Sequence, residues 1–403
     1  ENLGAAIVGA MRQIEIANPD TLYGVLSMFS SQKWTNKAIL NDSKIRDLIE
    51  HLSKRKLGNK DYPADLMGDA YEILLKKFAD DSKAQAGEFY TPRSVVRLLV
   101  HILDPQPGET VYDPACGSGG MLIEAIRYMH DDSLCCGSIF GQEKNVVNAA
   151  IAKMNLFLHG ASDFNVMQGD TLRDPKILQG GNIAKFDCVI ANPPFSLENW
   201  GATEWSSDKY KRNIYGTPSD SCGDYAWIQH MICSMSSGKG RMAVVMPQGI
   251  LFRGNQEAEI RKQLVESDLI EAVVTLGDKL FYGTGLSPCF LIIRRMKPAH
   301  HSGRILMIDG SKILTQKRAQ NILEENDIDR LYSLYQNYSD EEDYSRIVTL
   351  QEIRDKEYNL SPNRYVVYHK EEIRPYVEVL AEFKHAYEDV KRLEKEFSLL
   401  INA

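Results

Sequence analysis

Short apolar runs alternate with helical periodicities through the middle of the chain. The runs have the length of buried strands, and apolar residues at helical spacing lie between them, as in Val95 to Ile102 and Met121 to Met129. This alternation predicts an α/β fold with a mostly parallel sheet. Seven strands are expected, over residues 110–113, 138–142, 164–168, 189–191, 241–246, 270–276 and 289–294.

The flanking segments have other patterns. Residues 1–86 are expected to form an N-terminal helical domain, with an amphipathic helix at Ala64 to Ala79. The α/β domain is placed at 87–310, and the polar, Tyr-rich stretch 311–368 is expected to be its helical extension. In 369–403 apolar residues recur at steps of three and four, which predicts a helix with a heptad-like seam. We expect a helix of a partner protein to pack against this seam. Packing of the seam on the chain's own domain is the alternative.

Composition narrows the class of protein. The chain has 403 residues, 43% hydrophobic and 25% charged, which is ordinary globular usage. It contains no run of 18 apolar residues and begins at Glu1 without an initiator Met, so we expect no membrane span and a missing start. The seven cysteines form no C-x-x-C pair, so neither a disulfide framework nor a metal site is expected, and a reducing cytoplasm fits best. A net charge of −8 has the wrong sign for a chain that grips nucleic acid alone.

The most informative motif is Asn192-Pro193-Pro194-Phe195, which follows an apolar strand. Proline cannot continue the strand, so the chain must turn outward with the Asn192 amide at the strand's carboxyl end, where ligands bind in open α/β sheets. The amide oxygen and the Pro193 carbonyl are neighbouring acceptors suited to an exocyclic NH2, and Phe195 offers a stacking face. A plain turn with a packed Phe is the alternative for this motif taken alone.

Three acids and a glycine turn follow the preceding strands. Asp113 begins the run Asp-Pro-Ala-Cys-Gly-Ser-Gly-Gly, while Glu143 and Asp170 follow the next two strands. Strand, glycine turn and helix open a nucleotide-binding half-domain, in which an acid after the second strand would bind a ribose diol. Each acid alone is more simply a cap or turn residue.

Two further segments could flank a ligand. Gly87 to Arg93 places Phe89 and Tyr90 just before an expected helix start at Thr91, although these aromatics could equally anchor that helix. Leu197 to Gly223 interleaves aromatic and basic residues, which suggests a DNA-facing loop; a surface loop without such a role is the alternative. Its candidate DNA-facing residues are Lys209, Lys211 and Arg212.

In their order and composition these motifs resemble those of S-adenosylmethionine-dependent DNA adenine N6-methyltransferases, specifically modification subunits of type I restriction–modification systems. The resemblance rests on Phe89-Tyr90-Thr91-Pro92, on the Asp113 to Gly120 run, on Gly141-Gln142-Glu143, on Gly169-Asp170 and on Asn192 to Phe195. It implies a seven-stranded, mostly parallel methyltransferase (Rossmann-like) sheet and a catalytic set of Asn192, Pro193, Pro194 and Phe195. It also implies an S-adenosylmethionine site made of Glu88, Phe89, Tyr90, Thr91, Pro92, Arg93, Asp113, Ala115, Gly117, Ser118, Gly119, Gly120, Glu143 and Asp170.

The resemblance further implies partners. The substrate would be duplex DNA with a flipped adenine, and a specificity subunit would read the sequence and bind the C-terminal helix. A second modification subunit and a restriction subunit would complete the complex. The alternatives are a stand-alone adenine or protein-glutamine methyltransferase, and a non-catalytic cofactor-binding scaffold. The intact Asn192-Pro193-Pro194-Phe195 argues against a scaffold.

Overall fold

The chain divides into two compact units, Glu1–Val366 and Val367–Ala403. The computed structural model describes residues 2–19, 21–22, 24–27, 34–54, 68, 70–71, 73, 91–129, 137–161, 163–281, 287–318, 320–369 and 376–401. Among these residues, no helix combines the length and the apolar character needed to cross a membrane.

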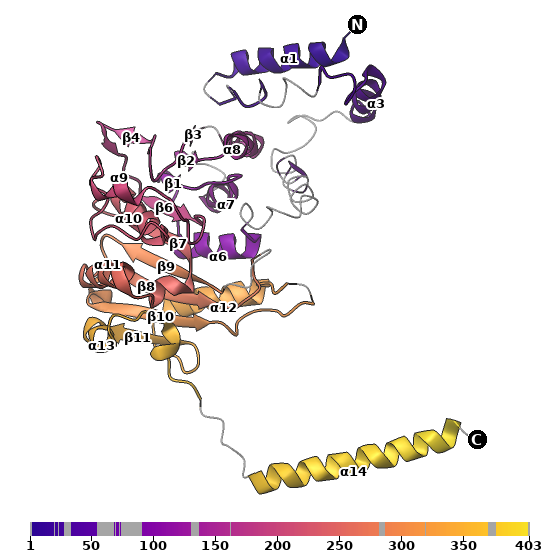
Figure 1. The fold of residues 1–403 in the computed structure, drawn as a ribbon, viewed down its shortest axis with the longest axis vertical. Helices are drawn as coiled ribbons and strands as arrows, with labels where there is room; N and C mark the ends of the chain where they lie inside the picture. The colour runs from indigo at the N-terminus through magenta and orange to yellow at the C-terminus, as the bar shows by residue number, and fades with distance from the viewer. Residues whose placement is uncertain are drawn as a thin grey trace. The chain divides into compact units, whose positions relative to one another are not determined.

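A mixed sheet forms the centre of the first unit (Figure 1). In the described part of the chain it has nine strands, in the order β11-β10-β8-β9-β7-β6-β1-β2-β3. Their bounds are β1 Val111–Asp113, β2 Ile139–Glu143, β3 Phe164–Gln168, β6 Cys188–Ala191, β7 Arg241–Pro247, β8 Ile270–Leu276, β9 Pro288–Arg294, β10 Arg304–Gly310 and β11 Ser345–Thr349. A separate small hairpin pairs β4 (Leu178–Gln179) with β5 (Asn182–Ile183).

The predicted α/β fold is confirmed, but the strand count of seven is wrong by two. The additional strands are β10, which pairs in parallel with β8, and β11, which pairs antiparallel with β10. The stretch 311–368 is therefore not wholly helical. It contains β11 as well as the helices α12 (Glu325–Asn337) and α13 (Leu350–Asp355) and the 3-10 turn η3 (Pro362–Arg364).

Strand direction decides where the candidate site residues lie. The neighbours β3, β2, β1, β6 and β7 all pair in parallel, so their carboxyl ends share one edge of the sheet. Strand β9 is inserted antiparallel between β7 and β8. The segments that follow β1, β2, β3 and β6 therefore emerge side by side.

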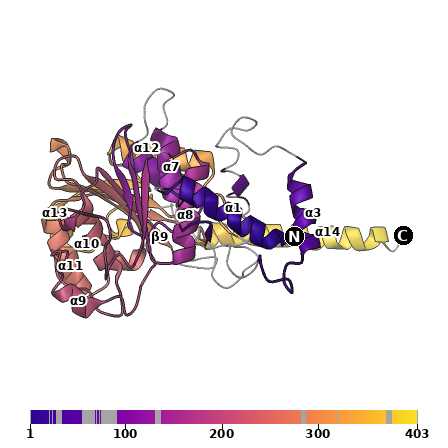
Figure 2. The same ribbon diagram turned by 90° about the horizontal axis from the view of Figure 1, so that it is seen from above.

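Helices cover both faces of the sheet (Figures 1 and 2). One apolar core packs α6 (Arg93–Leu103), α7 (Gly120–Met129), α8 (Val146–Leu158) and α12 against one face. The second core lies on the other face and includes side chains of α9 (Ala202–Ser206), α10 (Asp224–Ser234), α11 (Asn255–Glu266), α13 and the 3-10 turn η1 (Gln248–Leu251). Alternate strand residues feed the two cores, as Val111 and Tyr112 do, because successive strand side chains point to opposite faces. A further 3-10 turn, η2 (Ala299–His301), precedes β10.

Two N-terminal helices, α1 (Leu3–Ala17) and α3 (Asp42–Leu52), begin at asparagine caps. The predicted helix at Ala64 to Ala79 lies mostly outside the described residues. The expected start of the helix before the sheet, at Thr91, is wrong. The N-cap of α6 is Pro92, and the side chain of Thr91 makes its hydrogen bond outside this helix.

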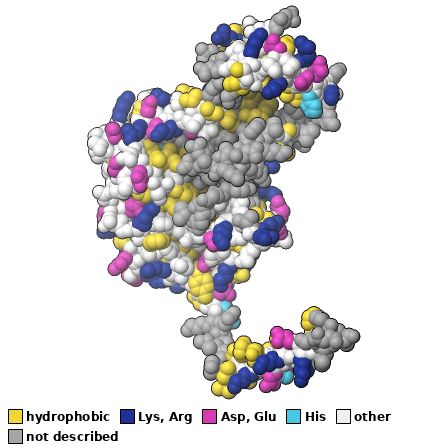
Figure 3. Space-filling view, turned by 45° about the vertical axis from the view of Figure 1, so that its right-hand side comes forward, with side chains coloured by type: hydrophobic (Ala, Val, Ile, Leu, Met, Phe, Trp, Pro, Cys, Tyr) yellow, Lys and Arg dark blue, Asp and Glu magenta, His cyan; other side chains and the backbone are white. Residues whose placement is uncertain are grey.

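The second unit contains the 26-residue helix α14 (Tyr376–Ile401). Figure 3 shows apolar side chains along it, interspersed with charged ones. The exposed large apolar residues of the helix are Val377, Val379, Phe383, Tyr387, Val390, Leu393 and Phe397. The rings of Phe383 and Tyr387 stack at 6.3 Å, so adjacent turns of the helix contribute to one continuous apolar stripe.

Candidate active site at the strand ends

Asn192 stands at the carboxyl end of β6, whose four residues are all buried. Its side-chain nitrogen Nδ2 donates a hydrogen bond to Thr91 Oγ1, with 2.8 Å between the atoms. Its side-chain oxygen Oδ1 is buried and has no hydrogen-bond partner among the described residues. Because an unpaired buried acceptor is costly, this oxygen is available to a donor that the described residues do not supply.

A second group of side chains holds the turn that follows Asn192. The backbone N–H of Ser196 donates to Asp224 Oδ1 at 2.7 Å, and Ser196 has a φ of +49°, in the left-handed region. Asp224 is fully buried and forms an ion pair with Arg253, which also pairs with Glu257 at 2.6 Å. This network fixes the position of the half-buried Phe195 just before it.

The glycine turn links β1 to α7. Gly117 and Gly119 have φ values of +52° and +84°, which residues with a Cβ rarely adopt, so the turn depends on glycine at these positions. Asp113 Oδ1 accepts a hydrogen bond from the Ala115 N–H at 2.9 Å. The backbone of Ser118 is fixed by Asn155, which donates to its carbonyl at 3.0 Å.

Glu143 lies at the end of β2 and forms that side of the candidate site. Its carboxylate accepts hydrogen bonds from the backbone N–H groups of Gly117 at 2.9 Å and Asn145 at 2.7 Å. Burial raises the pKa of Glu143 above its ordinary value. Burial also raises the pKa of Asp113 to about 8, and the charge of Glu143 contributes to this shift. Two neighbouring carboxyl groups of this kind favour a ligand that carries positive charge.

Asp170 lies beside Glu143, after β3. The backbone N–H of Gly169 donates to the Glu143 carbonyl at 2.9 Å, which joins the two strand ends. The Asp170 carboxylate pairs with Lys144 at 2.8 Å and accepts from the Arg173 N–H at 3.2 Å. The structure therefore brings Asp113, the glycine turn, Glu143, Asp170 and Asn192 to one edge, as the sequence indicated.

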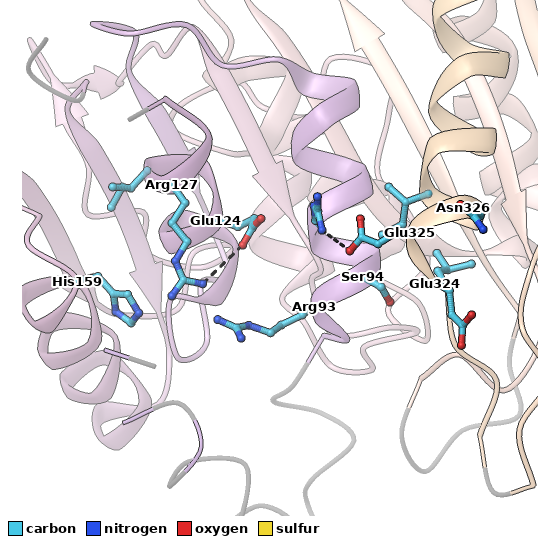
Figure 4. A pocket seen from close by; sticks show the side chains of 12 residues that line it. Arg93, Ser94, Glu124, Arg127, His159, Glu324, Glu325 and Asn326 are labelled. Carbon is cyan, nitrogen blue, oxygen red and sulfur yellow. Dashed lines mark hydrogen bonds and ion pairs between the residues drawn. The ribbon is translucent and has the colours of Figure 1, made fainter. Parts of the chain in front are cut away.

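The segment before α6 is described only in part. Glu88, Phe89 and Tyr90 lie outside the described residues, and Arg93 is exposed. Arg93 lines a cavity of 1030 Å³ between α6, α7, α8 and α12 (Figure 4). Other charged groups around this cavity form ion pairs, Arg97 with Glu325 at 2.5 Å and Arg127 with Glu124 at 3.9 Å.

The prediction that Arg212 faces DNA is wrong. Arg212 is 1% exposed and lies against the Trp205 ring at 4.4 Å. All five of its side-chain N–H groups have acceptors within 3.3 Å: both Asp208 oxygens, the carbonyls of Thr171 and Leu172, and His230 Nδ1. Lys209 and Lys211 are exposed, and contact between them and DNA stays a prediction.

Sequence reasoning missed the buried network to which Arg212 belongs. His230 accepts from Arg212 through Nδ1 and lies 3.1 Å from the Tyr112 hydroxyl through Nε2, and burial lowers its pKa. The Thr171 hydroxyl donates to the Pro114 carbonyl at 2.6 Å. The network thus joins the segment after Phe195 to the chain just before the glycine turn and just after Asp170.

Comparisons with known proteins agree with this arrangement. The profile of the family N-6 DNA Methylase matches residues 62–373. The MjaVII type I restriction enzyme methylase subunit of Methanocaldococcus jannaschii is 38% identical over 365 residues, which cover 87% of this chain and 61% of that protein. The HindI methylase subunit of Haemophilus influenzae is 31% identical, with coverage of 87% and 76%. The chain therefore spans less than two thirds of the first of these relatives.

A solved structure has the same fold over most of its length. The type I restriction-modification system methyltransferase subunit from Streptococcus thermophilus superposes with a TM-score of 0.81 at 29% identity. The superposition covers 91% of this chain and 77% of that one.

Proposed function

Because the chain belongs to the N-6 DNA Methylase family, we propose that it transfers a methyl group from S-adenosylmethionine to the N6 amino group of adenine in DNA. It would act as the modification subunit of a type I restriction–modification complex, as the names of its relatives suggest. The observation that carries the proposal is the buried Oδ1 of Asn192 at the carboxyl end of β6, which has no hydrogen-bond partner in the described part of the chain.

This oxygen meets the chemical requirement of the reaction. The N6 lone pair of adenine is delocalised into the ring, so the amine becomes nucleophilic only when acceptors hold its hydrogens. Asn192 Oδ1 and the Pro193 carbonyl would accept hydrogen bonds from these two N–H groups and stabilise the positive charge that develops on nitrogen. No covalent enzyme intermediate is needed, and the buried Cys116 and Cys188 are small core residues.

The residues beside Asn192 fit S-adenosylmethionine. When bound, this cofactor supplies an electrophilic methyl group on a positively charged sulfur. Asp113 and the turn from Gly117 to Gly120 would bind its methionine portion, Glu143 would accept from the ribose hydroxyls, and Asp170 would bind the adenine amine. Support comes from the paired carboxyl groups of Asp113 and Glu143 at a glycine turn, which suit a cationic ligand with hydroxyl donors.

The target adenine must leave the DNA duplex to reach Asn192. Phe195 is half-buried beside Phe281, with ring centroids 6.4 Å apart, and its ring would stack on the flipped base. Lys209 and Lys211 would contribute phosphate contacts. With a net charge of −8, however, most of the affinity for DNA must come from a partner.

We further propose that α14 docks on the specificity subunit of such a complex. From Val379 to Phe397 its exposed apolar residues recur at steps of three and four, and they are 46–66% exposed. A stripe of this kind is stabilised by burial against another helix. A second modification subunit and a restriction subunit would join the same assembly.

Transfer of labelled methyl groups from S-adenosylmethionine to duplex DNA tests the proposed activity. We expect label in N6-methyladenine when the chain is combined with its specificity subunit, and only a small residual amount when Asn192→Ala replaces the wild type in that complex. Transfer by the chain alone would indicate a stand-alone enzyme. Label in protein glutamine, or cofactor binding without any transfer, would overturn the DNA assignment in favour of a protein methyltransferase or a scaffold.

A further inference from the structure

Thr91 and Asn192 are 101 residues apart in the sequence, yet their side chains meet at the site. Asn192 Nδ2 donates to Thr91 Oγ1 at 2.8 Å, while Asn192 Oδ1 has no partner among the described residues. An amide has a donor end and an acceptor end of nearly the same shape, so its neighbours decide which end faces a ligand. Here the donor end is engaged by the protein and the acceptor end is left for the ligand.

We propose that Thr91 is a positioning residue for methyl transfer, which holds the Asn192 amide with Oδ1 turned toward the target amine. This inference rests on the proposed function. It departs from the sequence-based expectation that Thr91 contacts the cofactor.

The hydroxyl of Thr91 is on a rigid support. It lies immediately before Pro92 and α6, and α6 buries seven of its eleven residues in the core on one face of the sheet. Asn192 is fixed in turn by the buried strand β6 and by Pro193. The two side chains are therefore brought together by elements that are each anchored independently, which is what orienting a reacting group requires.

Loss of the hydroxyl removes the only acceptor among the described residues that engages Nδ2. The amide is then free to rotate, and a flipped amide would present N–H groups to the N6–H groups of adenine. Donor facing donor weakens the stabilisation of the developing charge, so the defect should fall on turnover. Affinity for S-adenosylmethionine should not change, because the groups proposed to bind it lie at the ends of β1, β2 and β3 or directly after them.

The test uses Thr91→Val, which keeps the shape of the side chain without the hydroxyl, and Thr91→Ser, which keeps the hydroxyl. Both are measured in the complex with the specificity subunit and DNA. We expect Thr91→Val to lower kcat roughly 10- to 100-fold, with an unchanged Kd for S-adenosylmethionine, which also shows that the variant is folded. Thr91→Ser should retain most of the wild-type kcat. In an Asn192→Ala background Thr91→Val should have no additional effect on the residual rate, because Thr91 acts through Asn192.

Three outcomes would overturn the inference. A wild-type kcat in Thr91→Val would exclude a role for the hydroxyl. A raised Kd for the cofactor with normal kcat at saturation would assign Thr91 to the cofactor site instead. A wild-type complex that methylates no DNA adenine would remove the proposed function itself, and is distinguished from the first two because it appears before any variant is made.

Discussion

The carboxylate of Glu143 accepts a hydrogen bond from the backbone N–H of Gly117, with 2.9 Å between Oε2 and N. Through this bond an acid at the end of β2 fixes the turn that follows β1. Glu143 therefore holds the glycine turn, and in the proposed cofactor site it would offer its remaining acceptor capacity to the ligand.

Replacement of Glu143 by Ala should weaken the binding of S-adenosylmethionine by roughly 30-fold or more, since hydrogen bonds to a charged group contribute about 1.5–3 kcal/mol each. Isothermal titration calorimetry measures the change. The control is Glu259→Gln on α11, which alters an exposed acid far from the strand ends in sequence and should leave the affinity as it is. Equal affinities in wild type and Glu143→Ala would contradict the assignment.

The affinity for S-adenosylmethionine should rise with pH between about 6 and 8. The pKa of Asp113 is raised to about 8, so this carboxyl is largely protonated below that pH in the free protein. A cationic ligand favours the ionised form, so binding below pH 8 releases a proton, and affinity increases by at most about tenfold per pH unit. Above the pKa the carboxyl is already ionised and this contribution levels off.

Calorimetry in two buffers with different ionisation heats gives the number of protons released. In Asp113→Asn the proton release should disappear, because that side chain cannot titrate. Proton uptake by the wild type, or the same release in Asp113→Asn, would show that Asp113 is not the titrating group.

Phe195→Ala should weaken binding of the flipped target base by roughly 1–3 kcal/mol, the contribution of one base stacked on an aromatic ring. Phe195→Tyr should retain most of the affinity. Binding of target duplex to the complex is measured with S-adenosylhomocysteine present, and Phe252→Ala, which alters a phenylalanine that is 55% exposed, is the control. An unchanged affinity in Phe195→Ala would exclude stacking on this ring.

Arg212→Lys should destabilise the chain by roughly 3–5 kcal/mol, because a lysine cannot satisfy the buried acceptors that surround the guanidinium. Thermal or urea unfolding measures the loss. Lys211→Ala is the matched neighbour. It should change stability by less than about 0.5 kcal/mol while it weakens DNA binding and lowers its salt dependence. If Arg212→Lys instead weakened DNA binding and Lys211→Ala destabilised the chain, Arg212 would belong to the DNA-facing surface.

Introduction of a charge into the apolar stripe of α14 should separate the chain from the specificity subunit that we propose binds this helix. Phe383→Asp and Leu393→Asp alter residues that are 66% and 58% exposed, so the helix itself loses little packing. Co-purification of the two subunits should fall in both variants. His385→Asp is the control, since it introduces the same charge at an exposed position about 200° around the helix from Phe383. If all three variants co-purified normally, another surface would have to make the contact.

The sequence predicted the site edge well because its signals are local. Asp113, Glu143 and Asn192 each follow an apolar run directly, and the turn glycines are adjacent in the chain. The apolar run Ile305 to Ile308 carries a similar strand signal, and it forms most of β10. Strand β11 had little signal of its own, because it is a short, partly polar edge strand that depends on pairing with β10.

Arg212 illustrates what local sequence cannot provide. Lys-Tyr-Lys-Arg reads as a basic surface segment, but the acceptors that bury Arg212 include the carbonyls of Thr171 and Leu172, about forty residues earlier in the chain. The contact between Thr91 and Asn192 is equally remote in sequence. In both cases the contacting residues can be identified only when the order of the strands in the sheet is known.

The reversed direction of β9 has a consequence for how such a protein could diversify. Because β9 runs against β7 and β8, the connection from Leu276 to Pro288 both leaves and re-enters the sheet at the edge where Asn192 lies. Phe281, within this connection, already meets Phe195. Insertions here would alter the surroundings of Phe195 while the strand ladder stays intact, so evolution or a protein engineer could change what the proposed site accepts without altering the sheet.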